Sequence, residues 1–155
     1  MPYSIDKRNT FLNLTFPTLS NKNTTYSAPS KLYLALCTND PVADNGAFTE
    51  LNEDTYARVL LARAGEDLPD YMSTINNGKI YNLKQITFNR AKANWTQVKG
   101  IGLFTDETNG SPIFYATLKN PVDTEENQIF TFDPGTFVVQ FADTDVEIEA
   151  EASAT

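Results

Sequence analysis

Alternating apolar and polar side chains along the chain predict a series of short β-strands. In residues 31–38 both alternating faces carry apolar groups, which is typical of a central strand covered on both sides. Asn-Gly pairs such as Asn45-Gly46 and Asn109-Gly110 suit turns with positive φ, and no long stretch has the helical period. We therefore expect a mainly β fold, an antiparallel β-sandwich. Its expected strands span residues 31–38, 56–62, 85–89, 100–105, 112–118, 137–141 and, with a weaker pattern, 128–132.

Residues 4–16 fit two kinds of secondary structure. Leu12 and Phe16 lie on one face of a helix, but the apolar residues at 12, 14 and 16 also alternate as in a strand. We favour a short helix, because Ser4 suits the N-cap and Pro17 would end the helix. This interpretation divides the chain into an N-terminal helical and linker segment (residues 1–25), a β-sandwich domain (residues 26–142) and an acidic C-terminal arm (residues 143–155).

The C-terminal arm is expected because the pattern changes its parity near Ala142. Phe137, Val139 and Phe141 place apolar groups at odd-numbered positions, whereas the odd-numbered positions from 143 to 149 are all acidic. One straight strand with a single buried face cannot carry both halves, so either a bulge reverses the facing or the chain leaves the sandwich. A departing arm would bury its apolar edge against a neighbouring subunit, and a frayed, solvated tail is the other alternative. The residues expected at such an interface are Leu12, Phe16, Asp143, Asp145, Val146, Glu147, Ile148 and Glu149.

The charge of the chain is unevenly distributed. The net charge is −8, but residues 1–119 contain 12 basic and 11 acidic residues, whereas residues 120–155 contain nine acidic and no basic ones. A protein that binds nucleic acid or an anionic membrane normally carries a basic surface, so we expect neither partner. An acidic C-terminal quarter instead suits a basic protein surface or serves solubility. No apolar run is typical of a signal peptide or a membrane span, which predicts synthesis and folding in the cytoplasm.

The residue types limit the chemistry that this chain can carry out. It has no histidine, which excludes Ser-His-Asp and Cys-His catalysis, and its one cysteine, Cys37, lies in an apolar strand where we expect a buried thiol. No phosphate-binding glycine motif or calcium-loop order is present, so we expect no cofactor, no metal site and no enzymatic activity. Paired carboxylates leave glycoside hydrolysis as the remaining catalytic alternative. Its candidates are Glu53-Asp54, Glu66-Asp67 and Glu125-Glu126.

Several short segments, each too common to identify a family alone, occur together in a fixed order. They are residues 28–41 (APSKLYLALCTNDP), 48–50 (FTE), 56–59 (YARV), 86–88 (ITF) with Ala91, Trp95 and Val98, 101–104 (IGLF), Asn109-Gly110 and 132–137 (FDPGTF). Together they resemble a family of small tailed-phage virion proteins, described as tail-fibre-like, that share a gp80-like domain. The resemblance covers roughly residues 26–141, while the excursion around Pro69-Asp70-Tyr71 and the end after Ala142 depart from the pattern.

The resemblance implies a non-enzymatic structural protein of the virion, made in the host cytoplasm. It implies an accessory outer component, namely a tail-fibre-like, head-fibre or capsid-decoration protein, that contacts other capsid, collar or tail proteins. It also implies a homo-oligomer, with a trimer as the first expectation. The alternative is a receptor-binding module in which Trp95 and Tyr71 contact a host glycan, whereas packing in a core or an interface is the more common use of such aromatic side chains and the one we favour. Within the body, we expect Arg58 to be a buried structural cation paired with an acid such as Glu50.

Overall fold

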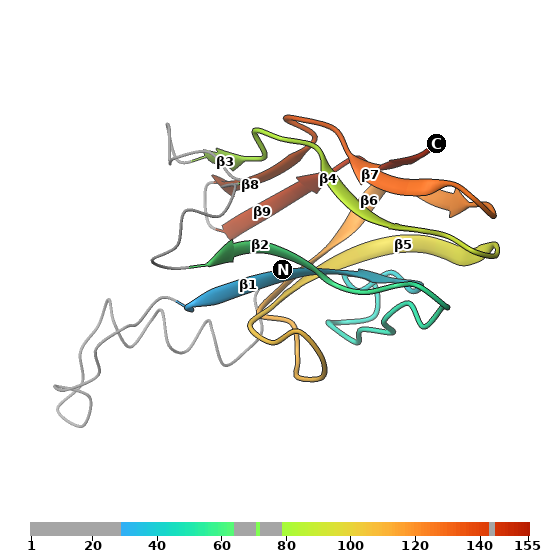
Figure 1. Cartoon of the computed structure of the whole chain (residues 1–155). Helices are drawn as coiled ribbons and strands as arrows, with labels where there is room; N and C mark the ends of the chain where they lie inside the picture. The colour runs from blue at the N-terminus through green and yellow to red at the C-terminus, as the bar shows by residue number, and fades with distance from the viewer. Residues whose placement is uncertain (1–28, 64–70, 72–78, 143–144) are drawn as a thin grey trace, which may run out of the picture.

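Antiparallel β-strands make up the regular structure of the described part of the chain (Figure 1). The computed structural model describes residues 29–63, 71, 79–142 and 145–155. The helix expected over residues 4–16 and the interface residues Leu12, Phe16 and Asp143 lie outside the described residues. The strands are β1 (Lys31–Cys37), β2 (Val59–Arg63), β3 (Lys79–Tyr81), β4 (Ile86–Arg90), β5 (Trp95–Phe104), β6 (Phe114–Thr124), β7 (Ile129–Phe132), β8 (Phe137–Ala142), β9 (Asp145–Ala150) and β10 (Ser153–Ala154).

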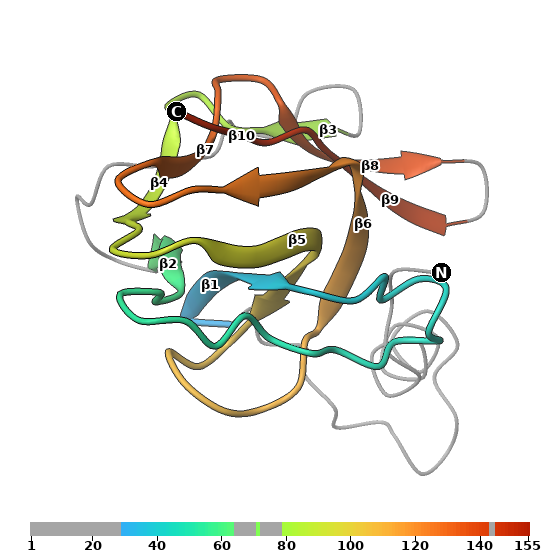
Figure 2. The same ribbon diagram turned by 90° about the vertical axis from the view of Figure 1, so that its right-hand side faces the viewer.

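The strands form three hydrogen-bonded sheets. The largest has the order β2-β1-β5-β6, and the other two have the orders β10-β7-β4 and β3-β8-β9. Neighbouring strands run antiparallel in each of them. In Figure 2 β1 and β5 lie on one side of the core, and β7 and β10 lie on the other. The described residues therefore confirm a mainly β, antiparallel fold.

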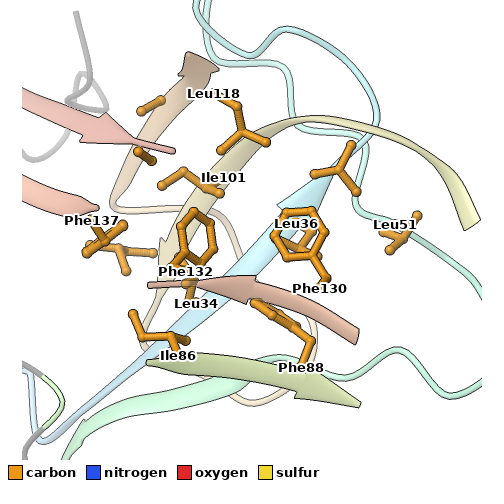
Figure 3. Packing of buried hydrophobic residues seen from close by; sticks show 14 of the residues in the cluster. Leu34, Leu36, Leu51, Ile86, Phe88, Ile101, Leu118, Phe130, Phe132 and Phe137 are labelled. Carbon is orange, nitrogen blue, oxygen red and sulfur yellow. The ribbon is translucent and has the colours of Figure 1, made fainter. Parts of the chain in front are cut away.

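Aliphatic and aromatic side chains from both layers fill the space between them. Figure 3 shows Phe130 and Phe132 of β7 close to Leu34 and Leu36 of β1. The two phenylalanine rings have centroids 5.6 Å apart in an edge-to-face arrangement. All four side chains are fully buried. Burial of each stabilises the fold by about 1.5–3 kcal/mol relative to leaving the side chain exposed.

Strand β1 is covered on both of its faces. Leu34 and Leu36 belong to the main core, whereas Tyr33 and Ala35 form a second buried cluster with Phe104. Because side chains alternate along a strand, one apolar run supplies both clusters. The structure thus confirms that this segment is a central strand.

Two strands are longer than their sequence patterns predict. β5 begins at Trp95, and β6 continues as far as Thr124. Val98 pairs with Val122 but Gly100 pairs with Thr117, so β6 contains extra residues that form a bulge. Pro121 lies in this bulge, where its missing N–H does not interrupt a regular hydrogen-bond ladder. The strands expected at residues 31–38, 85–89, 128–132 and 137–141 are confirmed to within one residue, whereas β3, β9 and β10 are not predicted and β2 begins three residues later than expected.

The C-terminal residues fold back onto the body, which corrects the expectation of an arm. β9 runs antiparallel to β8, with Val139 opposite Ile148, and only two residues separate the strands in the sequence. This connection places odd-numbered residues opposite even-numbered ones, which explains the change of parity near Ala142. β10 then pairs with β7, and Ile129 exchanges two backbone hydrogen bonds with Thr155.

Candidate functional site

A buried ion pair joins two short motifs that lie between β1 and β2. Arg58 Nη2 lies 2.6 Å from Glu50 Oε2, and Arg58 Nε donates to Glu50 Oε1 at 2.8 Å. The Arg58 side chain is 3% exposed and that of Glu50 is 30% exposed. Two parallel charge-assisted hydrogen bonds make this a strong and geometrically specific contact. The structure therefore confirms the expected pairing of these residues.

Arg58 also holds the connection between β5 and β6. Its Nη1 group donates to the backbone oxygens of Asp106 at 2.8 Å and Asn109 at 2.9 Å, and its guanidinium carbon lies 3.6 Å from the centroid of the Phe104 ring. The connection turns at Asn109 and Gly110, whose φ angles of 62° and 77° confirm the expected positive values. Arg58 thus links this turn to the segment that precedes β2 through hydrogen bonds.

Tyr56 links the ion pair to the central strand. Its hydroxyl donates to Glu50 Oε1 at 2.9 Å and accepts the backbone N–H of Leu36 at 3.0 Å. β2 pairs with β1 only as far as Leu34, so the tyrosine serves a backbone group that the neighbouring strand does not reach. Burial raises the pKa of the Tyr56 hydroxyl far above its usual value of 10.0, so the group stays protonated. We call Glu50, Tyr56 and Arg58 the clasp.

Phe48 completes the aromatic side of the clasp. Its ring meets that of Phe104 edge to face, with centroids 5.3 Å apart. A Cβ at Gly102 would lie 2.7 Å from the Phe48 ring, closer than real Cβ atoms approach their neighbours. β5 therefore needs a glycine at this position so that Phe48 can reach Phe104.

An open pocket of about 450 Å³ lies beside the clasp. The segment around Glu50 and the turn that Arg58 fastens both contribute to its lining. Its polar lining residues include Arg58 and Tyr56, whose donor groups are already engaged within the clasp and the turn. The others are the carboxylates of Glu50 and Glu107, the amides of Asn52 and Asn109 and the hydroxyl of Thr108. These groups are rich in hydrogen-bond acceptors. The arrangement is suited to holding a ligand that donates hydrogen bonds.

Other chemistry-bearing groups are few in the described part of the chain. There, no three histidine, cysteine, aspartate or glutamate side chains are grouped as metal ligands would be. Cys37 is buried, as expected, and desolvation raises its pKa to about 12, so the thiol is protonated at neutral pH. No helix among the described residues has the length and apolar character needed to cross a membrane.

A comparison with known families accounts for most of the chain. Residues 7–140 match the model of a family described as podophage GP4 fiber I protein gp80. The chain belongs to this family. A search of the curated proteins gave no match. The match confirms the resemblance to gp80-like phage proteins and makes the chain a fibre-family component of a phage virion.

The clasp is built from the segments that carry the likeness to the gp80 family. Glu50 ends the FTE segment, Tyr56 and Arg58 belong to YARV, and Phe104 ends IGLF. The segment that contains β1 supplies the backbone N–H of Leu36. Four separate segments, one of them distant in the sequence from the other three, therefore meet at one place in the fold, which gives their joint order a physical meaning.

The two residues named for the glycan-binding alternative lie in or against the core, and Trp95 packs there as the favoured interpretation of its aromatic ring expects. Its side chain is 5% exposed, and its ring meets that of Tyr56 at a right angle with centroids 6.1 Å apart. Tyr71 is partly buried and packs against the same core. A sugar stacks on an exposed aromatic face, and Trp95 offers none in this structure.

The expected interface residues of the C-terminal segment belong to β9. Ile148 is partly buried and packs against the chain's own core, so this part of the apolar edge faces inward. Glu149 is exposed and accepts a hydrogen bond from Gln140 Nε2 at 3.4 Å. The backbone register places Asp145, Val146 and Glu147 opposite Ala142, Phe141 and Gln140 of β8.

Asn82 is a buried polar residue that no pattern in the sequence singles out. Its side-chain nitrogen donates to the backbone oxygens of Lys84 and Asp133, each at 2.9 Å, and its Oδ1 accepts the N–H of Phe137 at 3.0 Å. The residue thereby fixes the FDPGTF turn between β7 and β8. Asparagine is common in exposed turns, so its residue type does not mark this one as buried.

Proposed function

We propose that this protein is an accessory structural component of the phage fibre apparatus, without enzymatic activity, that assembles through protein–protein contacts. The observation that carries the proposal is that Arg58, Tyr56 and Glu50 are all engaged in holding the fold. Membership of a fibre family supports it. In this proposal the two layers around the core act as a rigid β-sandwich that carries assembly surfaces on its outside.

The outer side of the sheet β3-β8-β9 is the surface we favour for assembly. The register aligns Tyr81, Val138 and Glu149 in one row across the three strands. Tyr81 is 37% exposed, and Leu83, just after β3, is 53% exposed. A surface that mixes apolar and acidic groups suits a protein interface with a polar rim. We expect it to join copies of this chain into a homo-oligomer, a trimer by analogy with fibres.

Purified virions and the purified chain together test this function. Mass spectrometry and imaging of antibody-labelled particles should place the chain on the outside of the virion, and light scattering should give a multiple of the monomer mass. Leu83→Lys should weaken association, whereas Val42→Lys, at a 44% exposed apolar residue in the loop after β1, is the matched control. A stable monomer that binds no virion protein would contradict the proposal.

A further inference from the structure

The pocket beside the clasp has a volume typical of ligand-binding sites. Its volume of about 450 Å³ falls within the range of roughly 300–1,000 Å³ that ligand pockets occupy. One part of its lining comes from residues 50–52 and 56–58, and the other comes from residues 107–109. The two parts are tied together through the bonds from Arg58 to the backbone oxygens of Asp106 and Asn109. Hydrogen bonds of the fold thus connect the two sides of the pocket.

The charges around the pocket favour a cationic occupant. The pocket lining contains two acidic residues, Glu50 and Glu107, and one basic residue, Arg58. Arg58 is buried, and its charge is compensated by Glu50 and by two carbonyl oxygens. The Glu107 carboxylate therefore leaves the lining with a net negative charge, which attracts cations and repels anions.

Glu50 is the best-positioned acceptor in the pocket. Among the described residues, three donors approach its carboxylate, namely the Tyr56 hydroxyl and two nitrogens of Arg58, and they use three of its roughly four acceptor positions. Its side chain remains 30% exposed, so a further donor can approach from the solvent side. Because the clasp already fixes this carboxylate, a guest would bind without the entropic cost of ordering it.

We propose that this pocket receives a lysine or arginine side chain from a neighbouring virion protein. The inference rests on the proposed function, because it names the chemistry of one contact through which the fibre component assembles. The cationic head lies between the carboxylates of Glu50 and Glu107, and the aliphatic stem lies along Ala57. The volume exceeds that of one side chain, so adjoining backbone of the guest enters with it and contacts Asn52 and Thr108.

Titration of the full chain with short blocked peptides tests the pocket. We would add acetyl-Gly-Arg-Gly-amide or acetyl-Gly-Lys-Gly-amide and follow backbone amide signals by NMR. Saturable shifts at Asn52, Ala57 and Thr108, weakened by added salt, are expected. Acetyl-Gly-Gln-Gly-amide, calcium chloride and methyl glycosides are the comparison probes. Equal shifts with the glutamine peptide, or shifts with calcium or a glycoside but with neither cationic peptide, would overturn the inference.

A charge variant with a matched control sharpens this test. Glu107→Gln should weaken cationic-peptide binding about two- to fivefold, because it removes one exposed carboxylate from the pocket. Glu125→Gln changes the net charge equally at an exposed position between β6 and β7, and should leave binding unchanged. Equal loss in both variants would mean that only overall charge matters and would contradict a specific pocket.

Measuring whether the chain is present on purified virions distinguishes a failure of the pocket inference from a failure of the proposed function. If wild-type chain is found on virions but the cationic peptides do not bind, the pocket inference is wrong and the structural role stands. If the chain is absent from virions, the proposed function fails whatever the peptides do. Reduced loading of Glu107→Gln, with normal loading of Glu125→Gln, would support both.

Discussion

The clasp and the C-terminal segment both contain acidic residues, but the acids lie in different physical settings. At the clasp, Glu50 meets an arginine that is 3% exposed, and the contact distance is 2.6 Å. Near the C-terminus, Glu151 lies 3.6 Å from Lys119, with side chains 56% and 71% exposed. An exposed ion pair contributes little because water and salt screen it, whereas an unpaired buried charge is costly. Burial, rather than the number of charges, therefore decides which acid matters for folding.

The C-terminal segment is held by its backbone and its apolar residues. β9 pairs with β8 over six residues, and β10 pairs with β7. Ala150 is 2% exposed, and Ile148 packs against the main core. The acidic side chains accompany a strand at the edge of its sheet, where charge discourages pairing with other chains. We therefore attribute the stability of this region to strand pairing and packing.

Removing residues 143–155 should have the largest effect. The truncation deletes β9 and β10, takes the hydrogen-bond partners from β8 and exposes the side of Phe137 that Ala150 covers. We expect the loss of more than about 5 kcal/mol, which is comparable to the whole stability of a domain. Circular dichroism and urea unfolding measure this loss.

A charge-only variant is the control for the truncation. Replacing Glu149 and Glu151 with glutamine keeps the strands and should change the free energy of unfolding by less than about 1 kcal/mol. A truncated chain that unfolds as cooperatively as the full chain, at the same urea concentration, would show that the segment is a dispensable arm after all.

Breaking the clasp should have the second-largest effect. Glu50→Gln leaves Arg58 buried without its counter-charge, and we expect a loss of about 2–4 kcal/mol, below the upper end for buried pairs because Glu50 is partly exposed. Urea unfolding of this variant should be compared with that of Glu151→Gln, which removes one acid from an exposed ion pair. Equal and small losses in the two variants would contradict the view that burial outweighs the number of charges.

The sequence predicts the charged partners of the clasp but not the backbone groups that complete it. Arg58 and Glu50 were identifiable because a buried arginine requires an acid nearby. The carbonyl oxygens of Asp106 and Asn109 were not, because a backbone oxygen has the same identity at every position. The pocket arises from the same tertiary contacts, so no linear motif marks it.

The same limit applies to the fold. The apolar faces of β1 predict a central strand because both are visible within one short segment. The parity change near Ala142 was visible too, but an antiparallel return and a departing arm produce the same local pattern. Trp95 was open to two uses, since its residue type suits both stacking on a sugar and packing in a core. Only the position of distant segments decides such cases.

Two further carboxylates, those of Asp40 and Glu53, differ from the acids of the clasp and of the C-terminal segment because hydrogen bonds hold them. Asp40 accepts hydrogen bonds from the Thr117 hydroxyl and the N–H of Ala43, which lower its pKa below the usual 3.8. Glu53 accepts the hydroxyl and the N–H of Thr96, which lower its pKa below 4.5. Hydrogen bonds are the largest cause of both shifts, and the charge of Lys99 makes a smaller contribution at Asp40.

Acidification should therefore lower the free energy of unfolding through Asp40 and Glu53. This loss should be smaller than the loss caused by the truncation or by breaking the clasp. Folding lowers both pKa values, so near pH 4 the unfolded chain binds more protons than the folded one. The stabilisation is complete above the unfolded pKa values and is lost as the pH falls through the lower, folded ones. Urea unfolding between about pH 6 and pH 3 should show a smaller decline for Asp40→Asn with Glu53→Gln than for wild type. Glu125→Gln, at an exposed carboxylate, controls for the loss of charge. If stability declines as steeply with falling pH in the double variant as in this control, then acids other than Asp40 and Glu53 govern the pH dependence.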